Sequence, residues 1–175
     1  MKCVWICLLA AAAAATLAAQ PFTSPPATAS VTIDGKAIKI NYCAPSMHGR
    51  KIAGGLVPYG KVWRAGANDA TILHTEADLN IGGVAVPKGD YSLYVLPEQN
   101  EWKLIVNKKT GQWGINHDGS TTEDPAFDVG RATMTLGKTG PVETFKIGLT
   151  EAGPKAGKLQ MEWENTVASI SFTVK

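Results

Sequence analysis

Cysteine is scarce in this chain, and its positions exclude a disulfide-stabilised fold. Cys3 and Cys7 lie in an apolar N-terminal segment, so Cys43 is the one thiol in the rest of the sequence. A single cysteine cannot form an intramolecular disulfide. The domain is therefore expected to be held together by core packing.

Long apolar runs are absent after the N-terminus. The one such run, residues 4–15, follows Lys2 and is closed by the small-residue pattern of residues 17–19. This layout is typical of a secretory signal peptide, whereas a membrane-spanning helix needs about 20 apolar residues. We therefore predict that residues 1–19 are a cleaved signal peptide. The mature protein is expected in the periplasm or the extracellular space, with no integral membrane segment.

The chain also lacks an excess of charge of either sign. Its 17 basic and 15 acidic side chains give a formal net charge of +2, which falls to +1 when Lys2 leaves with the signal peptide. Such a balance provides no electrostatic attraction to nucleic acid or to an anionic membrane. Neither is expected as a partner.

Helical periodicity is missing as well, and a period of two takes its place. Residues 31–33 and 38–42 alternate around Asp34-Gly35, a two-residue hairpin signal, and a second such signal stands at Gly82-Gly83. Residues 90–96 are apolar on both faces, as in a central strand. Further strands are expected at residues 71–75, 79–81, 84–86, 102–107, 132–136, 145–149, 159–163 and 168–174, with the last turn at Asn165.

These patterns predict an all-β fold, an antiparallel β-sandwich or jelly roll with little helix after the signal peptide. Residues 20–30 are rich in Pro, Ser, Thr and Ala and are expected to form a flexible leader. Residues 31–175 are then a single β-sandwich domain of ordinary size.

One irregular segment, residues 47–71, concentrates cations, aromatic rings and glycines. Arginine recognises oxyanions with paired hydrogen bonds, and an indole face stacks on a sugar ring or an apolar group. We expect this segment to meet residues 112–117, which belong to a polar stretch without periodicity, and to form a ligand site there. The candidate ligand-binding residues are Arg50, Tyr59, Lys61, Trp63, Arg64, Asn68, Asp69 and Trp113.

The same residues also permit a purely structural interpretation. Trp63 would then close one end of the sandwich, and Arg64 would pair with Asp69 inside the segment. The glycines would serve only to allow left-handed turns. Trp113 is either an exposed contact or a lid over the segment.

Signatures of catalysis and of metal binding are weak. Glu162 and Glu164 are two residues apart on one expected strand, a position typical of solvated surface charges rather than of an acid–base pair. The histidines, His48, His74 and His117, lack the spacing of a zinc site. No catalytic residue, metal ligand or cofactor is therefore assigned, and a binding protein is favoured over an enzyme.

Several long sequence words carry a family resemblance. They are GRKI at residues 49–52, GGLVPYGKVWR at residues 54–64, GAN at residues 66–68 and PKGDYSLY at residues 87–94. With these words the chain resembles a bacterial exported family known as domain of unknown function 2911, over about residues 30–174. The resemblance implies export and a mostly β fold, and it supplies no reaction, substrate or cofactor.

The leading prediction for function is an exported β-sandwich protein that binds a polar or anionic small molecule, a glycan or a peptide in the cell envelope. A first alternative is an envelope hydrolase that acts on glycans or peptides through carboxylates such as Asp69, Glu162 or Glu164. A second alternative is a structural or interaction protein without a small-molecule site.

Overall fold

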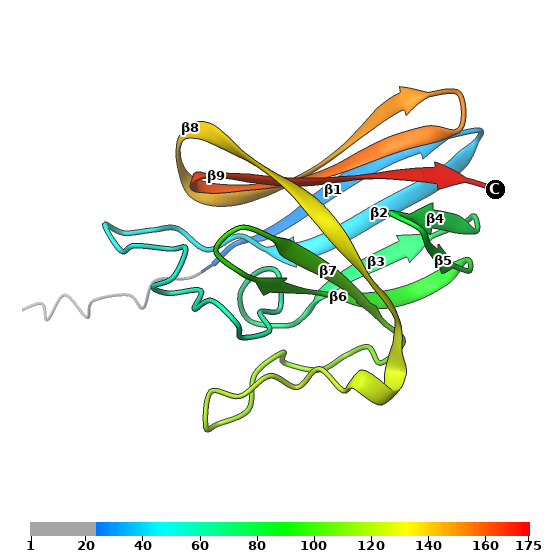
Figure 1. The fold of residues 1–175 in the computed structure, drawn as a ribbon. Helices are drawn as coiled ribbons and strands as arrows, with labels where there is room; N and C mark the ends of the chain where they lie inside the picture. The colour runs from blue at the N-terminus through cyan, green and yellow to red at the C-terminus, as the bar shows by residue number, and fades with distance from the viewer. Residues whose placement is uncertain (1–23) are drawn as a thin grey trace, which may run out of the picture.

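The computed structural model describes residues 24–175, so the predicted signal peptide and residues 20–23 of the predicted leader lie outside the described part. Within it, nine antiparallel strands and one 3-10 helix form the fold (Figure 1), and no helix is long and apolar enough to cross a membrane. The all-β prediction is confirmed. The elements are β1 (Pro26–Ile33), β2 (Lys36–Cys43), β3 (Thr71–Thr75), β4 (Leu79–Ile81), β5 (Val84–Val86), β6 (Gly89–Pro97), β7 (Trp102–Asn107), η1 (Pro125–Phe127), β8 (Asp128–Gly153) and β9 (Ala156–Val174).

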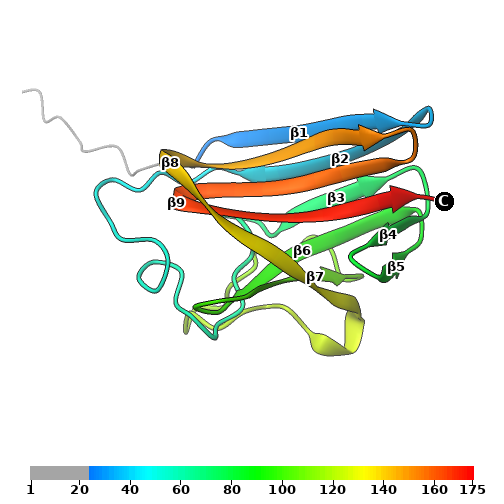
Figure 2. The same ribbon diagram turned by 45° about the horizontal axis from the view of Figure 1, so that its top comes forward.

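The strands form one sheet that folds over on itself, because β8 takes part in two layers. The strand order is β1-β2-β3-β6-β7-β8-β9-β4-β5, and β8 pairs with β7 near its start and with β9 over the rest of its length. Figure 2 shows most strands running side by side along one long axis, with the first part of β8 crossing them diagonally and the segment between β2 and β3 at one end. Side chains of both layers meet in one apolar core, for example Ile40 and Leu73 with Phe145 and Met161.

Two hairpin turns have the conformation that their residues predict. Between β1 and β2, Asp34 and Gly35 have φ angles of 51° and 70°, as a type I′ turn requires. Between β4 and β5, Gly82 and Gly83 have φ angles of 54° and 95°. Both predicted hairpins are confirmed.

Strand β6 is central, as its continuous apolar pattern predicts. It lies between β3 and β7, and every residue from 91 to 95 is buried. Leu93 faces the main core, whereas Tyr94 packs in a second, small cluster with Ala70 and Ile105. This second cluster lies under the irregular segment and attaches it to the sheet.

The leader prediction is wrong for its last residues. Strand β1 begins at Pro26, so residues 26–30 pair with β2 in a continuous register from Pro26 opposite Cys43. Ala29 is buried and contributes to the core. Proline at the first position of an edge strand costs no ladder hydrogen bond, so the Pro-rich composition did not prevent strand formation.

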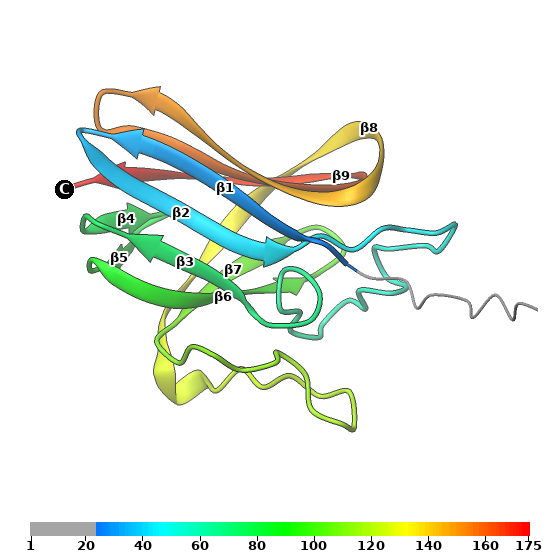
Figure 3. The ribbon, with the colours of Figure 1, turned by 180° about the vertical axis from the view of Figure 1, so that it is seen from behind.

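The last four expected strands are joined into two long ones. Strand β8 spans residues 132–136 and 145–149, and β9 spans residues 159–163 and 168–174. Figure 3 shows that the β8–β9 hairpin bends back on itself, and the pairing register shifts at this place, around Val142. Glu164 takes φ 55° there. The chain reversal expected at Asn165 is therefore a bend within a paired strand, not a turn between strands.

Gly157 on β9 marks a close approach between the layers and yields a stability test. A Cβ atom at this position would lie 2.7 Å from Ile33 Cδ1 and closer still to the Phe172 ring. Gly157→Ala is expected to lower the free energy of unfolding by about 1–3 kcal/mol, measured by urea denaturation, because the core is overpacked.

Gly148→Ala is the matched control for this substitution. Gly148 lies on the neighbouring strand β8, and a Cβ atom there meets nothing within 4 Å. This variant is expected to change stability by less than about 1 kcal/mol, in the stabilising direction. Equal effects of the two substitutions would contradict the packing at Gly157.

Candidate functional site

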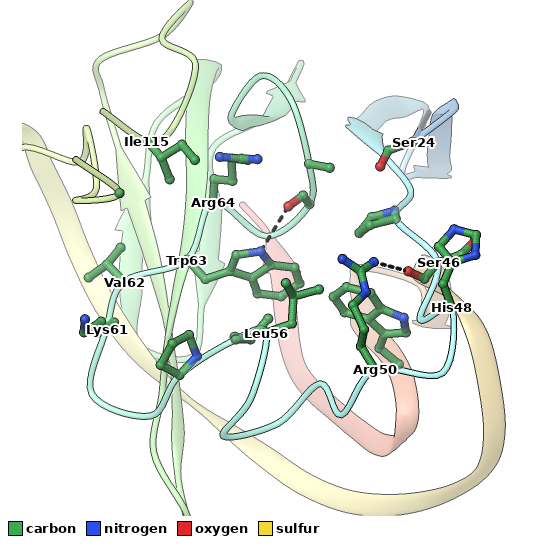
Figure 4. A pocket seen from close by; sticks show the side chains of 17 residues that line it. Ser24, Ser46, His48, Arg50, Leu56, Lys61, Val62, Trp63, Arg64 and Ile115 are labelled. Carbon is green, nitrogen blue, oxygen red and sulfur yellow. Dashed lines mark hydrogen bonds between the residues drawn. The ribbon is translucent and has the colours of Figure 1, made fainter. Parts of the chain in front are cut away.

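A cleft opens at the loop end of the sandwich, where the segment between β2 and β3 meets the tip of the loop between β7 and η1. Its volume is about 440 Å³. Figure 4 shows that Lys61, Trp63 and Arg64 come from the first segment and Ile115 from the second loop. The two are joined by a hydrogen bond of 3.0 Å from the backbone N–H of Ala70 to the carbonyl of Gln112. The predicted meeting of these two stretches is present in the structure.

The floor of the cleft is aromatic. The Trp63 and Trp163 rings stack with centroids 5.8 Å apart, and Phe145 meets the Trp63 ring edge-on at 5.0 Å. The indole N–H of Trp63 donates to the carbonyl of Gly66 at 3.0 Å, and that of Trp163 donates to the carbonyl of Glu143 at 3.1 Å. Both polar groups are thereby satisfied, and the rings are fixed as a flat surface.

Arg64 forms one wall of the cleft, and its charge has no ion-pair partner among the described residues. Its Nε atom is buried without a hydrogen bond, and no ion pair of the described residues involves it. Burial lowers the pKa of the guanidinium, and electrostatic interaction with the ionisable groups of Cys43 and Asp69 opposes this shift. The ion pair between Arg64 and Asp69 that the structural interpretation predicted is therefore not formed.

Arg50 stands on another wall and is oriented by the backbone. Its Nη2 donates to the carbonyl of Ser46 at 2.8 Å, and its Nε donates to the carbonyl of Met47 at 2.9 Å. The same turn is fastened to β8, because the N–H of His48 donates to the Glu143 carboxylate at 2.9 Å. The guanidinium position is thus set by local geometry.

The charge lining the cleft has one sign. Arg50, Lys61 and Arg64 all line it, and no aspartate or glutamate of residues 24–175 does so. Apolar side chains fill much of the remaining wall, among them Leu56 and Ile115, which are 45% and 37% exposed. Cations on apolar, partly dry walls attract an anion more strongly than cations in open water.

The structure divides the predicted site residues into two groups. Arg50, Lys61, Trp63 and Arg64 line the cleft.

The other four predicted residues do not line the cleft. Tyr59 packs over Gly54, and the Asn68 side chain donates to the carbonyl of Ser24 at 3.4 Å. Asp69 is exposed, and Trp113 is 53% exposed outside the cleft.

Some lining residues had no sequence signal that identified them. Trp163 belongs to an alternating strand, and that pattern predicts a core residue. Leu56 and Ile115 are single apolar residues within polar or glycine-rich stretches. Their exposure together at the cleft is visible only in three dimensions.

The carboxylates considered for hydrolysis lie elsewhere. Glu164 accepts hydrogen bonds from the N–H groups of Ile52 and Ala53 at 3.3 and 3.2 Å, and Glu162 accepts one from Gln160 at 2.6 Å. Neither carboxylate lines the cleft. Among residues 24–175, no three His, Cys, Asp or Glu side chains are grouped so as to hold a metal ion.

A polar cluster fastens the base of the second loop. Arg131 on β8 donates to the Glu123 carboxylate at 2.7 Å and to the Asp128 carboxylate at 2.8 Å. Asn107 donates to Asp128 and to the carbonyl of Asp124, each at 2.8 Å. The Glu123 side chain is only 3% exposed. Burial raises its pKa, the charge of Asp128 raises it further, and Arg131 opposes the shift.

The raised pKa of Glu123 predicts a specific pH dependence. The folded state favours the protonated carboxyl, so this contribution to stability is full below the unfolded pKa and is lost as the pH rises through the folded pKa. Relative to wild type, Glu123→Gln is expected to become progressively more stable from about pH 4 to about pH 8, because glutamine never ionises. Thermal unfolding of both proteins across this range measures the difference. A difference that stays constant or shrinks with rising pH would contradict the prediction.

Comparison with known proteins identifies a family. No curated protein and no solved structure matches the chain. One family profile, described as "Protein of unknown function (DUF2911)", matches residues 24–172. This range contains both loops of the cleft, and it confirms the resemblance carried by the sequence words. The chain therefore belongs to the DUF2911 family.

Proposed function

We propose that this protein binds a small anionic molecule in the cleft, as an exported binding protein of the cell envelope. The observation that carries the proposal is the guanidinium of Arg64, which forms no ion pair with any residue from 24 to 175 and whose buried Nε atom has no hydrogen-bond acceptor among them. A buried donor without a partner costs about 1–3 kcal/mol, and more when the group is charged. An oxyanion bound beside the guanidinium would supply the counter-charge that no described carboxylate provides.

The surroundings of Arg64 support the same proposal. Two further cations, Arg50 and Lys61, line the cleft, and no carboxylate of the described chain competes with a ligand there. The Trp63 ring offers a flat apolar surface beside the cations, and the buried Trp163 ring stacks against it. A volume of about 440 Å³ lies in the range of ordinary small-molecule sites.

The hydrolase alternative receives no comparable support. Its named carboxylates, Glu162 and Glu164, are engaged in hydrogen bonds outside the cleft, and Asp69 does not line it. General acid–base catalysis needs a group within hydrogen-bond reach of the reacting atoms. A binding function needs only the cations and the aromatic floor.

Paired probes that differ in charge test the proposal. Benzoate and glucuronate are expected to bind, whereas benzamide and glucose, their neutral counterparts, bind about tenfold more weakly or not at all. Isothermal titration calorimetry measures both. Affinity is expected to fall when NaCl is raised from about 0.05 M to about 0.5 M, because the lining cations are screened.

Substitutions in the cleft complete this test. Lys61→Glu introduces a negative charge at an exposed position, so the fold is expected to persist while anion affinity falls about tenfold. Trp113→Ala is the control, since Trp113 is exposed and lies outside the cleft. Equal binding of charged and neutral probes would overturn anion recognition. If none of the probes binds, the remaining interpretation is a structural or interaction protein without a small-molecule site.

A further inference from the structure

The cations of the cleft are spread around its aromatic floor. Figure 4 shows the guanidinium groups of Arg64 and Arg50 on different sides of the Trp63 ring. Arg64 packs against the second loop at Gly114, whereas Arg50 belongs to the turn that carries Ser46. The two guanidiniums therefore do not lie together on one wall of the cleft.

From this arrangement we infer that the preferred ligand carries two anionic groups on one flat, apolar body. Arg64 holds one anionic group and Arg50 holds the other, and the body lies on Trp63. The inference rests on the proposed anion-binding function and specifies the chemical class of its ligand.

The hydrogen-bonding capacity of both arginines supports two separate contacts. A guanidinium has five N–H donors. Arg50 uses donors on Nε and Nη2 for the carbonyls of Met47 and Ser46, which leaves Nη1 and one N–H of Nη2 without an acceptor among the described residues. The Arg64 side chain donates no hydrogen bond to any residue between 24 and 175, and because its Nε is buried, the N–H groups of its two Nη atoms are the donors left for a ligand. Each guanidinium can therefore receive its own carboxylate or phosphate oxygens.

Electrostatics favours two charges over one. Arg50, Lys61 and Arg64 repel one another across the cleft, and no carboxylate lines it within the described chain. A monoanion placed at one arginine leaves the other cations without a counter-charge. A second anionic group on the same ligand reduces that repulsion, and its binding costs no second loss of translational freedom.

The volume of the cleft is large enough for an aromatic ring. An apolar cavity of about 150 Å³ holds one benzene molecule, so a cleft of about 440 Å³ accommodates a ring together with two charged substituents. The walls beside the Trp63 ring are apolar and include Leu56, Val62 and Ile115. A flat aromatic body buries its faces there, and its charged groups point toward the arginines.

Matched dicarboxylates and monocarboxylates test the inference. Calorimetry would compare terephthalate with benzoate, and naphthalene-2,6-dicarboxylate with 2-naphthoate. At least one dicarboxylate is expected to bind about tenfold or more tightly than its monocarboxylate. Arg50→Met and Arg64→Met are each expected to reduce dicarboxylate affinity to the level of the monocarboxylate on wild-type protein.

Two controls keep the outcome clear. Trp113→Ala is expected to leave every affinity unchanged, and thermal unfolding checks that the arginine variants are folded. Arg50 is exposed, so its variant tests the inference even where Arg64→Met does not fold.

The outcomes separate this inference from the proposed function. If monocarboxylates bind as tightly as dicarboxylates, or if Arg50→Met weakens both equally, the two-anion inference is overturned while anion binding stands. If no carboxylate binds, both are overturned.

Discussion

Trp63 connects the irregular segment to the folded sheet, and the cleft exists because of this connection. Its backbone exchanges two hydrogen bonds of 2.8 Å with Val95 on the central strand β6. Its ring packs between the bent β8–β9 hairpin and the cleft, against Phe145 and Trp163. One residue thus belongs to the sheet through its backbone and to the site through its side chain. The segment before and after it can be irregular because the anchor lies in rigid structure.

Two arginines beside the second loop, Arg131 and Arg64, differ in whether a carboxylate of the described residues pairs with their charge. Arg131 contacts the carboxylates of Glu123 and Asp128, and this cluster only fastens the loop. Arg64 lies under the same loop and has no carboxylate partner among the described residues, although burial disfavours its charge. An unpaired, partly buried cation opposes folding, and a ligand would offset that cost. The contrast is in keeping with the proposed role of Arg64 in anion binding.

The sequence predicted the regular part of the fold well, because that part follows local rules. Asp34-Gly35 and Gly82-Gly83 adopt positive φ angles that glycine-containing turns favour, and alternation located the strands between them. The joined strands were missed, because a hairpin that keeps its hydrogen bonds through a bend looks in sequence like two hairpins. Glu164, with φ 55°, lies at such a bend without a glycine to mark it.

The residues that line the cleft were predicted only in part, because residue type indicates the chemistry of a side chain but not the direction in which it points. Arg50, Lys61, Trp63 and Arg64 were expected together because they stand in one irregular segment, and they do line one cleft. Asn68 was expected to join them, yet its backbone takes φ 58° and its side chain is directed to Ser24. Side-chain direction in a loop follows from individual backbone angles, which no periodic pattern encodes. The lining residue Trp163 came from a strand far along the chain, and only the bent hairpin brings it to the cleft.

Gly114 links the shape of the cleft to the base of the second loop. It has φ 91°, and a Cβ atom there would lie 2.5 Å from Arg64 Cδ, so only glycine permits the loop to cover the arginine. The loop is held near this position by the bond from Ala70 to Gln112, and at its end by Asn107. Movement of the loop away from Arg64 would hydrate the guanidinium and weaken its attraction for an anion. The width of the cleft and the strength of its charge are therefore set by the same contact.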